Sequence, residues 1–269
     1  MLSALFSGDF DRYFAEASQG TPLWLFVHVP KTAGSSMQME MAAISQPSAN
    51  IEIDYTDTTK PYHLLFDEAV QRFIDRQNQT PYRSATGHVV ARHTEMIRQA
   101  IPDLRCFSML RNPISRIISD YRYQCSQMNL AREQFIKTTP DFSTYIARKH
   151  VHNKTATALV PKPIVEARDD EAAINFVMEN FAFIGLQEMY PVALRTVTTL
   201  MGAPRAPEAR VRVNTETENT VELTPQEEAE LKQLNSVDMA LFSAFTQRWR
   251  SIRQDLRTYL STHGRPQAA

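Results

Sequence analysis

The sequence predicts an α/β protein with three layers, in which helices flank a mostly parallel central sheet on both faces. One observation is that short apolar runs typical of buried strands alternate along the chain with helical patterns. The other is that the first such run, residues 23–29, leads through a Gly-containing loop straight into a helix. Ligands of such folds bind beyond the carboxyl ends of the strands, so we expect the functional residues there.

Each expected element follows from its local pattern. Apolar runs predict strands over residues 23–29, 51–55, 83–86, 105–110 and 181–186. Apolar residues at helical spacing predict helices over residues 37–44, 63–77, 113–124, 169–180, 189–201, 225–234 and 237–260. Asn112 before Pro113, and Thr224 three residues before Glu227, predict capped helix starts. Residues 140–167 and the polar loop 203–223 show no such pattern.

Composition limits the function classes. The 269 residues suit a single domain over 1–269, with a core at about 21–262 and a loose tail at 263–269. The net charge of −1 and the lack of a long basic run argue against a nucleic-acid partner. No run of 18 apolar residues predicts a transmembrane segment, and residues 1–14 do not resemble a signal peptide. Two cysteines are too few for a disulfide scaffold, so we expect a cytoplasmic protein with Cys106 in its core.

The first chemical motif is the loop Pro30-Lys31-Thr32-Ala33-Gly34-Ser35-Ser36, between the first strand and its helix. Free backbone N–H groups at a helix start bind anions, and Lys31 adds a positive charge. Gly34 allows a close backbone approach, and the two serines add hydroxyl donors. The order differs from a Walker A loop, in which the lysine follows the last glycine. The motif favours a phosphate site over a plain turn with a solvated lysine.

The second motif, Ser108-Met109-Leu110-Arg111-Asn112-Pro113, also joins a strand to a helix. Arg111 is placed to bind a phosphate at the helix start, or else to pair with an acidic neighbour. Ser115 and Ser119 lie one turn apart on one face of that helix, with Arg116 beside them.

The third motif is Gly87-His88, at the end of another strand. A histidine there can act as a general base, although a lone histidine more often has a structural role. Six other histidines compete for the role of base, and we expect His28, inside the first strand, to be a core residue.

In order, these segments resemble the carbohydrate sulfotransferases that use 3′-phosphoadenosine 5′-phosphosulfate (PAPS), in particular the heparan and dermatan 2-O-sulfotransferase branch with its bacterial relatives. FVHVPKTAGSS is similar to the family's 5′-phosphosulfate loop, SATGHVV to its Gly-His segment and FSMLRNPISRIISDYRYQ to its 3′-phosphate segment. FAFIGLQEMY resembles a downstream Gly-Leu-x-Glu stretch, and the region of Asn214 with the helices after it is also similar. The similarity covers roughly residues 23–44, 83–125 and 181–249.

The resemblance implies a role for each matched residue. The 5′-phosphosulfate would be bound by Lys31, Thr32, Ala33, Gly34, Ser35 and Ser36. Arg111 and Ser119 would bind the 3′-phosphate, and His88 would be the catalytic base, with Lys31 stabilising the bridging oxygen as the S–O bond breaks. The product would be adenosine 3′,5′-bisphosphate, and no metal is expected because Lys31 can do what Mg²⁺ does in kinases.

Two departures and two alternatives remain. Asn112 replaces the family's usual Asp, and Val89 to Arg92 replace its usual continuation after His88, which bears on acceptor contacts.

A P-loop kinase or NTPase shares the P-loop-like fold but requires Gly-Lys-Ser or Gly-Lys-Thr, which this chain lacks. A nucleotide- or glycan-binding module without activity is the other alternative. The basic stretch 148–154, with Arg210 and Arg212, either lines an acceptor groove or is a solvated surface, and we favour the latter.

Overall fold

The computed structural model describes residues 1–54, 56–57, 59–206 and 221–263. At its centre is a five-stranded sheet with the order β2-β3-β1-β4-β5, in which every neighbouring pair is parallel. The strands are β1 (Leu23–Val27), β2 (Ser48–Ile51), β3 (Ser84–Gly87), β4 (Leu104–Leu110) and β5 (Phe183–Leu186). Parallel neighbours need a crossover between them, and for this reason helices alternate with strands along the chain.

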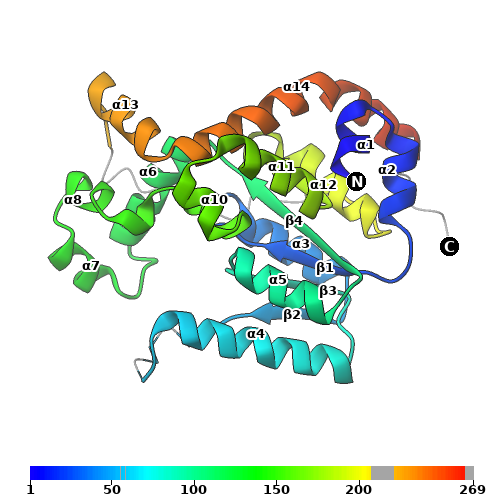
Figure 1. Cartoon of the computed structure of the whole chain (residues 1–269), viewed down its shortest axis with the longest axis horizontal. Coiled ribbons are helices and arrows are strands. Elements are labelled where there is room, and N and C mark those ends of the chain that lie inside the picture. The colour runs from blue at the N-terminus through cyan, green and yellow to red at the C-terminus, as the bar shows by residue number, and fades with distance from the viewer. Residues whose placement is uncertain (55, 58, 207–220, 264–269) are drawn as a thin grey trace.

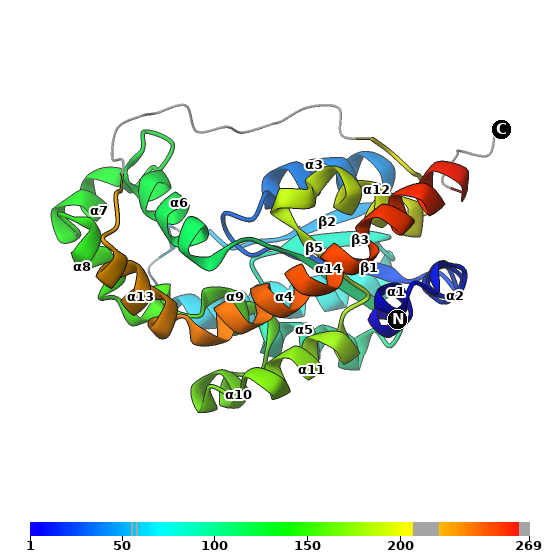
Figure 2. The same ribbon diagram turned by 90° about the horizontal axis from the view of Figure 1, so that it is seen from above.

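Helices cover both faces of the sheet, which confirms the predicted three-layer architecture. Figure 2 shows α3 and α12 on one face and α5 and α11 on the other. The helices are α1 (Leu2–Ser7), α2 (Phe10–Ala17), α3 (Gly34–Ile44), α4 (Tyr62–Gln79), α5 (Ala91–Ala100), α6 (Pro113–Cys125), α7 (Arg132–Thr138), α8 (Phe142–Ile146), α9 (Lys154–Leu159), α10 (Lys162–Ala167), α11 (Asp170–Asn180), α12 (Tyr190–Leu200), α13 (Pro225–Leu234) and α14 (Ser236–His263), with 3₁₀ turns η1 (Lys149–Val151) and η2 (Gln187–Met189).

The central strand β1 is buried along its whole length. Its side chains pack against helices on both faces, and Phe26 also stacks on Phe107 of β4 with ring centroids 5.0 Å apart. A strand covered on both faces has no polar side to present, which explains its unbroken apolar run.

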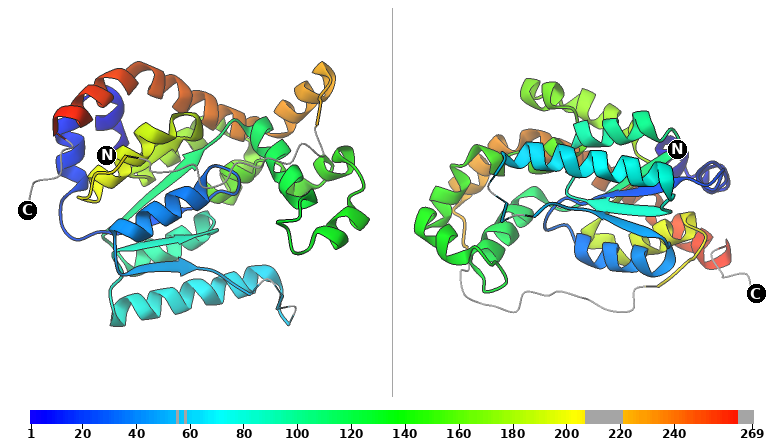
Figure 3. Two further views of the ribbon diagram at one scale, coloured as in Figure 1. Left: turned by 180° about the vertical axis from the view of Figure 1, so that it is seen from behind. Right: turned by 90° about the horizontal axis from the view of Figure 1, so that it is seen from below.

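The two ends of the chain pack together beside the sheet. Figures 1 and 3 show α14 running along one side of the molecule to reach α1 and α2. Tyr259 of α14 stacks on Phe14 of α2 with centroids 5.4 Å apart. Trp249 of α14 is fully buried, and its indole N–H donates to the carbonyl of Ile184 in β5 at 2.8 Å. The last helix is therefore tied both to the sheet and to the first two helices.

A smaller hydrophobic cluster lies apart from the main core, at the end of the molecule where α6, α7, α8 and α13 gather (Figure 1). We call this region, residues 113–151 and 225–234, the helical lobe. Its buried members are Ile114, Ile117, Tyr121, Cys125, Tyr145, Val151 and Leu231. Because α6 starts at the end of β4, the lobe stands directly next to a strand end.

The predicted elements are confirmed with shifted boundaries, and several further helices were not predicted. The strand expected at 51–55 is β2, three residues earlier, where the edge position lets the polar sequence SANI pair with β3. β1 ends at Val27 rather than at residue 29. Helices α1, α2, α5 and α7 were not predicted, and the unpatterned stretch 140–167 contains α8, η1, α9 and α10.

Both predicted helix caps are confirmed. The Asn112 side chain accepts from the N–H of Ser115 at 3.1 Å, and Thr224 and Glu227 form a reciprocal capping box. Cys106 is buried in the core, and burial raises the pKa of its thiol to about 12. Arg210, Arg212, Asn214 and tail residues 264–269 lie outside the described residues. Within the described ranges, no helix combines the length and apolar character that crossing a bilayer requires.

Candidate active site

The ends of β1 and β3 lie level at one edge of the sheet, and β4 continues past them to Leu110. Val27, the last residue of β1, is paired with Gly87 at the end of β3 and with Ser108 in β4. The next residue, His28, donates its backbone N–H to the Gly87 carbonyl at 2.9 Å. The segments that leave these strands, and with them the three sequence motifs, therefore start at the same edge of the sheet.

The loop of the first motif has an unusual backbone. Lys31 and Ala33 have φ values of +69° and +66°, in the left-handed region that costs a residue with a Cβ about 1–3 kcal/mol. Such alternation turns successive N–H groups toward a common point and forms a concavity for anions. Helix α3 begins at Gly34, so the N–H groups of its first turn add to the same site.

The side chains of this loop are only partly available to a ligand. Thr32 is fully buried, and its hydroxyl donates to the carbonyl of Val29 at 2.8 Å, so it stabilises the loop from within. Ser35 and Ser36 are half-buried in the first turn of α3. A phosphate at this loop would thus meet backbone N–H groups first, and serine hydroxyls second.

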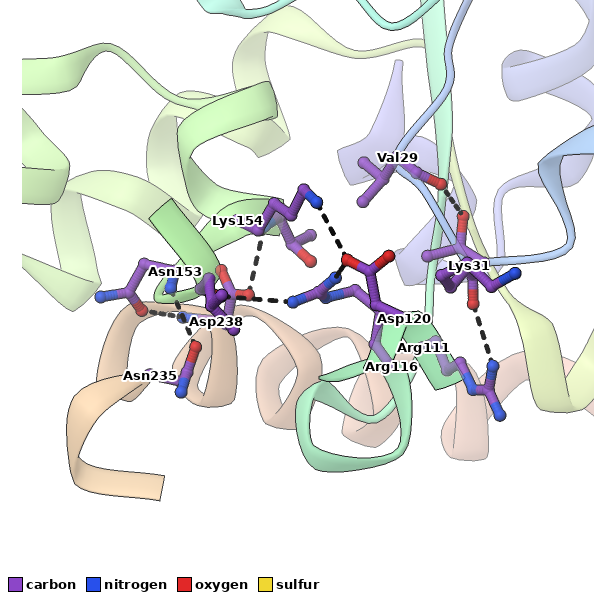
Figure 4. Close-up of polar contacts among 12 residues, drawn as sticks. Val29, Lys31, Arg111, Arg116, Asp120, Asn153, Lys154, Asn235 and Asp238 are labelled. Carbon is purple, nitrogen blue, oxygen red and sulfur yellow. Dashed lines mark hydrogen bonds and ion pairs between the residues drawn. The ribbon is translucent and has the colours of Figure 1, made fainter. Parts of the chain in front are cut away.

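Arg111 joins the second motif to the first. Its guanidinium donates to the backbone carbonyl of Lys31 at 3.1 Å (Figure 4). The Lys31 ammonium in turn lies 4.1 Å from the ring centroid of Tyr123 on α6, a cation–π contact. Burial lowers the pKa of Arg111, but an arginine stays charged and keeps several further donors. Ser119 is half-buried on the same helix. The predicted meeting of the two turns is therefore observed at the hydrogen bond from Arg111 to Lys31.

His88 has a defined tautomer. Its Nδ1 lies 2.7 Å from the carbonyl oxygen of His28, and because a carbonyl can only accept, Nδ1 must carry the hydrogen. Nε2 is then the nitrogen with a lone pair. The side chain is exposed, yet the atoms packed around the ring remove enough water to lower the pKa of His88. A neutral imidazole with a free Nε2 can accept a proton at neutral pH.

His28 belongs to this site rather than to the core of the strand, where the sequence placed it. Its ring stacks on Phe26 and lies 4.3 Å, centroid to centroid, from the ring of His88. Desolvation, followed by the nearby His88 and Lys31, lowers the pKa of His28 to about 3, so the ring is neutral. A Cβ on Gly34 would lie 1.9 Å from this ring. Position 34 therefore requires a glycine, because the His28 ring occupies the space that a side chain there would need.

Sequence analysis missed an ionic network beside these residues. Asp120 of α6 is 2% exposed, and its Oδ2 lies 3.2 Å from Arg116 Nη1 and 2.9 Å from Lys154 Nζ (Figure 4). Arg116 is fully buried and also donates to the carbonyl of Val151 at 3.3 Å. The Arg116 side chain thus points into the protein. It is not placed to bind the phosphate that we expect at Arg111 and Ser119.

The start of α14 holds Lys154 in place. Asp238 accepts hydrogen bonds from the N–H groups of Thr155 and Ala156, at 3.1 and 2.7 Å, and so caps α9 from another part of the chain. Asn153 donates its N–H to Asn235 and accepts from the N–H of Asp238. The solvated-surface interpretation of residues 148–154 is wrong for Lys154, which is half-buried and paired. The pairing with Asp120, 34 positions earlier, and the contacts with Asn235 and Asp238, more than 80 positions away, reveal this.

The arrangement suits anion binding and proton transfer. Among the described residues, no group of three or more His, Cys, Asp or Glu side chains is arranged to hold a metal ion. The same edge of the sheet does bring together a strained anion-binding loop, two cations from different turns and a neutral imidazole.

The chain is similar in sequence to a family of known enzymes. The model of the sulfotransferase family matches residues 20–160. Two solved structures are similar to the chain: a sulfotransferase from Alicyclobacillus acidocaldarius and the mouse sulfotransferase SULT7A1 complexed with PAP. The first is 18% identical to this chain with a TM-score of 0.47, and the match covers 83% of this chain and 95% of the Alicyclobacillus chain. The second has 12% identity and a TM-score of 0.44, and covers 92% and 93%. No curated protein sequence matches the chain.

Proposed function

Since the chain belongs to the sulfotransferase family, we propose that it transfers the sulfonyl group of PAPS to a hydroxyl, on a carbohydrate, with His88 as the base. The observation that carries this proposal is the hydrogen bond from Arg111 to the Lys31 carbonyl. It unites two anion-binding turns, and PAPS is a nucleotide with one anionic group at each end of its ribose. The carbohydrate class, and the heparan and dermatan 2-O branch, rest on the resemblance of the three motifs.

Each residue then has a role that its surroundings support. The loop N–H groups and the start of α3 bind the 5′-phosphosulfate, while Arg111 and Ser119 bind the 3′-phosphate. His88 Nε2 takes the proton of the acceptor hydroxyl as the acceptor oxygen bonds to sulfur. The bridging S–O bond breaks, and its electron pair leaves with adenosine 3′,5′-bisphosphate. Lys31 stabilises the charge that develops on the leaving oxygen.

The decisive test is a pair of titrations without added metal. We expect adenosine 3′,5′-bisphosphate to bind more tightly than adenosine 5′-phosphate, because only the former has a partner for Arg111. Arg111→Ala should weaken bisphosphate binding by roughly 10–100-fold and affect the monophosphate little. Arg250→Ala, an exposed arginine on α14, is the matched control and should change neither affinity. Equal affinities for the two nucleotides would contradict the proposal and favour a kinase-like site.

The role of His88 is tested with a screen of sugar hydroxyl acceptors and sulfate-labelled PAPS. His88→Ala should lower turnover on the order of 10²–10⁴-fold, the usual contribution of a general base. Bisphosphate affinity should stay the same in that variant. Full turnover by His88→Ala would move the base to another residue and leave the nucleotide assignment intact.

A further inference from the structure

Lys31 is contacted by residues at both ends of the segment that forms α6. Just before the helix, the Arg111 guanidinium donates to the Lys31 carbonyl at 3.1 Å. In the last turn of the helix, the ring centroid of Tyr123 lies 4.1 Å from the Lys31 ammonium nitrogen. The backbone and the side-chain charge of this one lysine are therefore both held by the same segment.

The backbone below the Tyr123 ring is well fixed. The carbonyl of Tyr123 accepts from the N–H and from the hydroxyl of Ser126, at 3.0 and 2.8 Å, and Ser126 is buried. Arg132 of α7 donates to the carbonyl of Cys125 at 2.7 Å. These bonds close the end of α6 and tie it to α7, so the half-buried ring starts from a defined position.

Tyr123 lies on the face of α6 that we expect to meet the nucleotide. It follows Ser119 by four residues, so the two side chains share one face of the helix. Ile117 and Tyr121 of the same helix pack into the helical lobe. Among the described residues, neither hydrophobic cluster includes Tyr123. Its observed contact is with a charge, and core packing does not account for the ring.

We propose that Tyr123 is a positioning residue for Lys31: its ring holds the ammonium at the loop of residues 28–36, where the cation meets the phosphosulfate. This inference rests on the proposed function. A lysine side chain is long and flexible, so ordering it only when substrate binds would be costly. An acidic partner would order it too, but would cancel the charge that the leaving oxygen needs. A ring face attracts the cation without neutralising it, and the ammonium has three N–H donors to offer.

The contact is tested by NMR on protein with ¹³C-labelled lysine and without substrate. Protons above an aromatic ring resonate upfield, so the ε-methylene signal of Lys31, assigned by its loss in Lys31→Arg, should lie upfield of its usual position. Tyr123→Leu should return this signal to the usual position, whereas Tyr123→Phe, which keeps a ring, should not. Tyr82→Leu is the matched control, because Tyr82 is also half-buried but stacks on Phe73 and precedes β3, at the opposite edge of the sheet.

Turnover measurements then show whether the contact serves the reaction. Tyr123→Leu should lower kcat for sulfonyl transfer roughly 2–30-fold, the range that the loss of a cation–π contact allows, with less change in the KM for PAPS. Tyr123→Phe should keep most of the turnover, and Tyr82→Leu should keep all of it. In a Lys31→Met background, Tyr123→Leu should have no further effect, because the ring then has no cation to hold.

A purely structural role for Tyr123 gives another pattern, in which Tyr123→Leu lowers turnover by the same factor with and without the Lys31 ammonium. That result would overturn the proposal, and so would an unchanged Lys31 signal or unchanged kcat in Tyr123→Leu. Should this variant fold poorly, Tyr123→Met, which also lacks a ring, replaces it in every measurement. The expected NMR shifts in a protein that transfers no sulfonyl group would support the held ammonium and reject the proposed function.

Discussion

The loop of residues 28–36 and the Asp120 network lie at the same candidate site, but the chain builds them in different ways. The loop is made from nine consecutive residues, 28–36, and its function follows from local backbone geometry. The network takes Arg116 and Asp120 from α6, Lys154 from α9 and the supporting Asn235 and Asp238 from the start of α14. The first is a continuous motif on the main core, whereas the second depends on tertiary packing at the helical lobe.

The largest expected loss of stability follows from a substitution in the Asp120 network. Arg116→Met removes a fully buried cation and leaves Asp120, which is almost fully buried, with less compensation. Losing one partner of a buried ion pair costs about 3–5 kcal/mol, so we expect a loss of that size in the free energy of unfolding. Denaturant unfolding measures it. Arg250→Met on the exposed face of α14 should change stability by less than about 0.5 kcal/mol. A loss below about 1 kcal/mol for Arg116→Met would show that the network is not needed for the lobe.

A smaller effect is expected on the loop side. Gly34→Ala places a Cβ 1.9 Å from the His28 ring, which must move away. We expect a loss of about 1–3 kcal/mol in unfolding free energy, the usual range for overpacking, even though alanine is the better helix former. The double variant His28→Ala/Gly34→Ala removes the clash, so its loss should be smaller than the sum of the single losses. Additive losses would mean that some other contact requires this glycine.

A third effect is a pH dependence of stability, which is absent at neutral pH and appears only in acid. The folded pKa of His28 is about 3, below the ordinary 6.5, so the unfolded chain takes up the proton first. The stability from the neutral ring is therefore complete above about pH 6.5 and is lost as the pH falls toward 3, by at most about 1.4 kcal/mol per pH unit. His28→Gln should show a shallower decline between pH 6.5 and 4 in denaturant unfolding. Parallel curves for the two proteins would contradict the neutral, partly desolvated state of His28.

The same contrast explains what could be predicted from the sequence. The parallel sheet and the two capped helices were predictable, because apolar runs and capping residues are local signals. The meeting of Lys31 with Arg111 followed from strand ends sharing one edge of a sheet. The edge strand β2 was misplaced because pairing with β3, rather than its own composition, makes it a strand.

The positions of Lys154 and His28 were also missed because they depend on tertiary contacts rather than on local sequence. Nothing local distinguishes Lys154 from the exposed Lys149, since its partner Asp120 lies 34 positions earlier in the chain. His28 was assigned to the core because the apolar run continues through it, whereas the strand ends one residue before it. Its proximity to Gly34 depends on how the loop turns back, which the motif does not specify.

The anchoring of α9 by Asp238 has a consequence for how the protein is made. A nascent chain can form β1, the loop and α3 early in translation, but the residue that secures Lys154 is synthesised more than 80 positions after it. The same late helix supplies Trp249 to β5. A ribosome that stalls before α14 would therefore release a chain that has the loop of residues 28–36 but lacks the contacts that fix the backbone around Lys154.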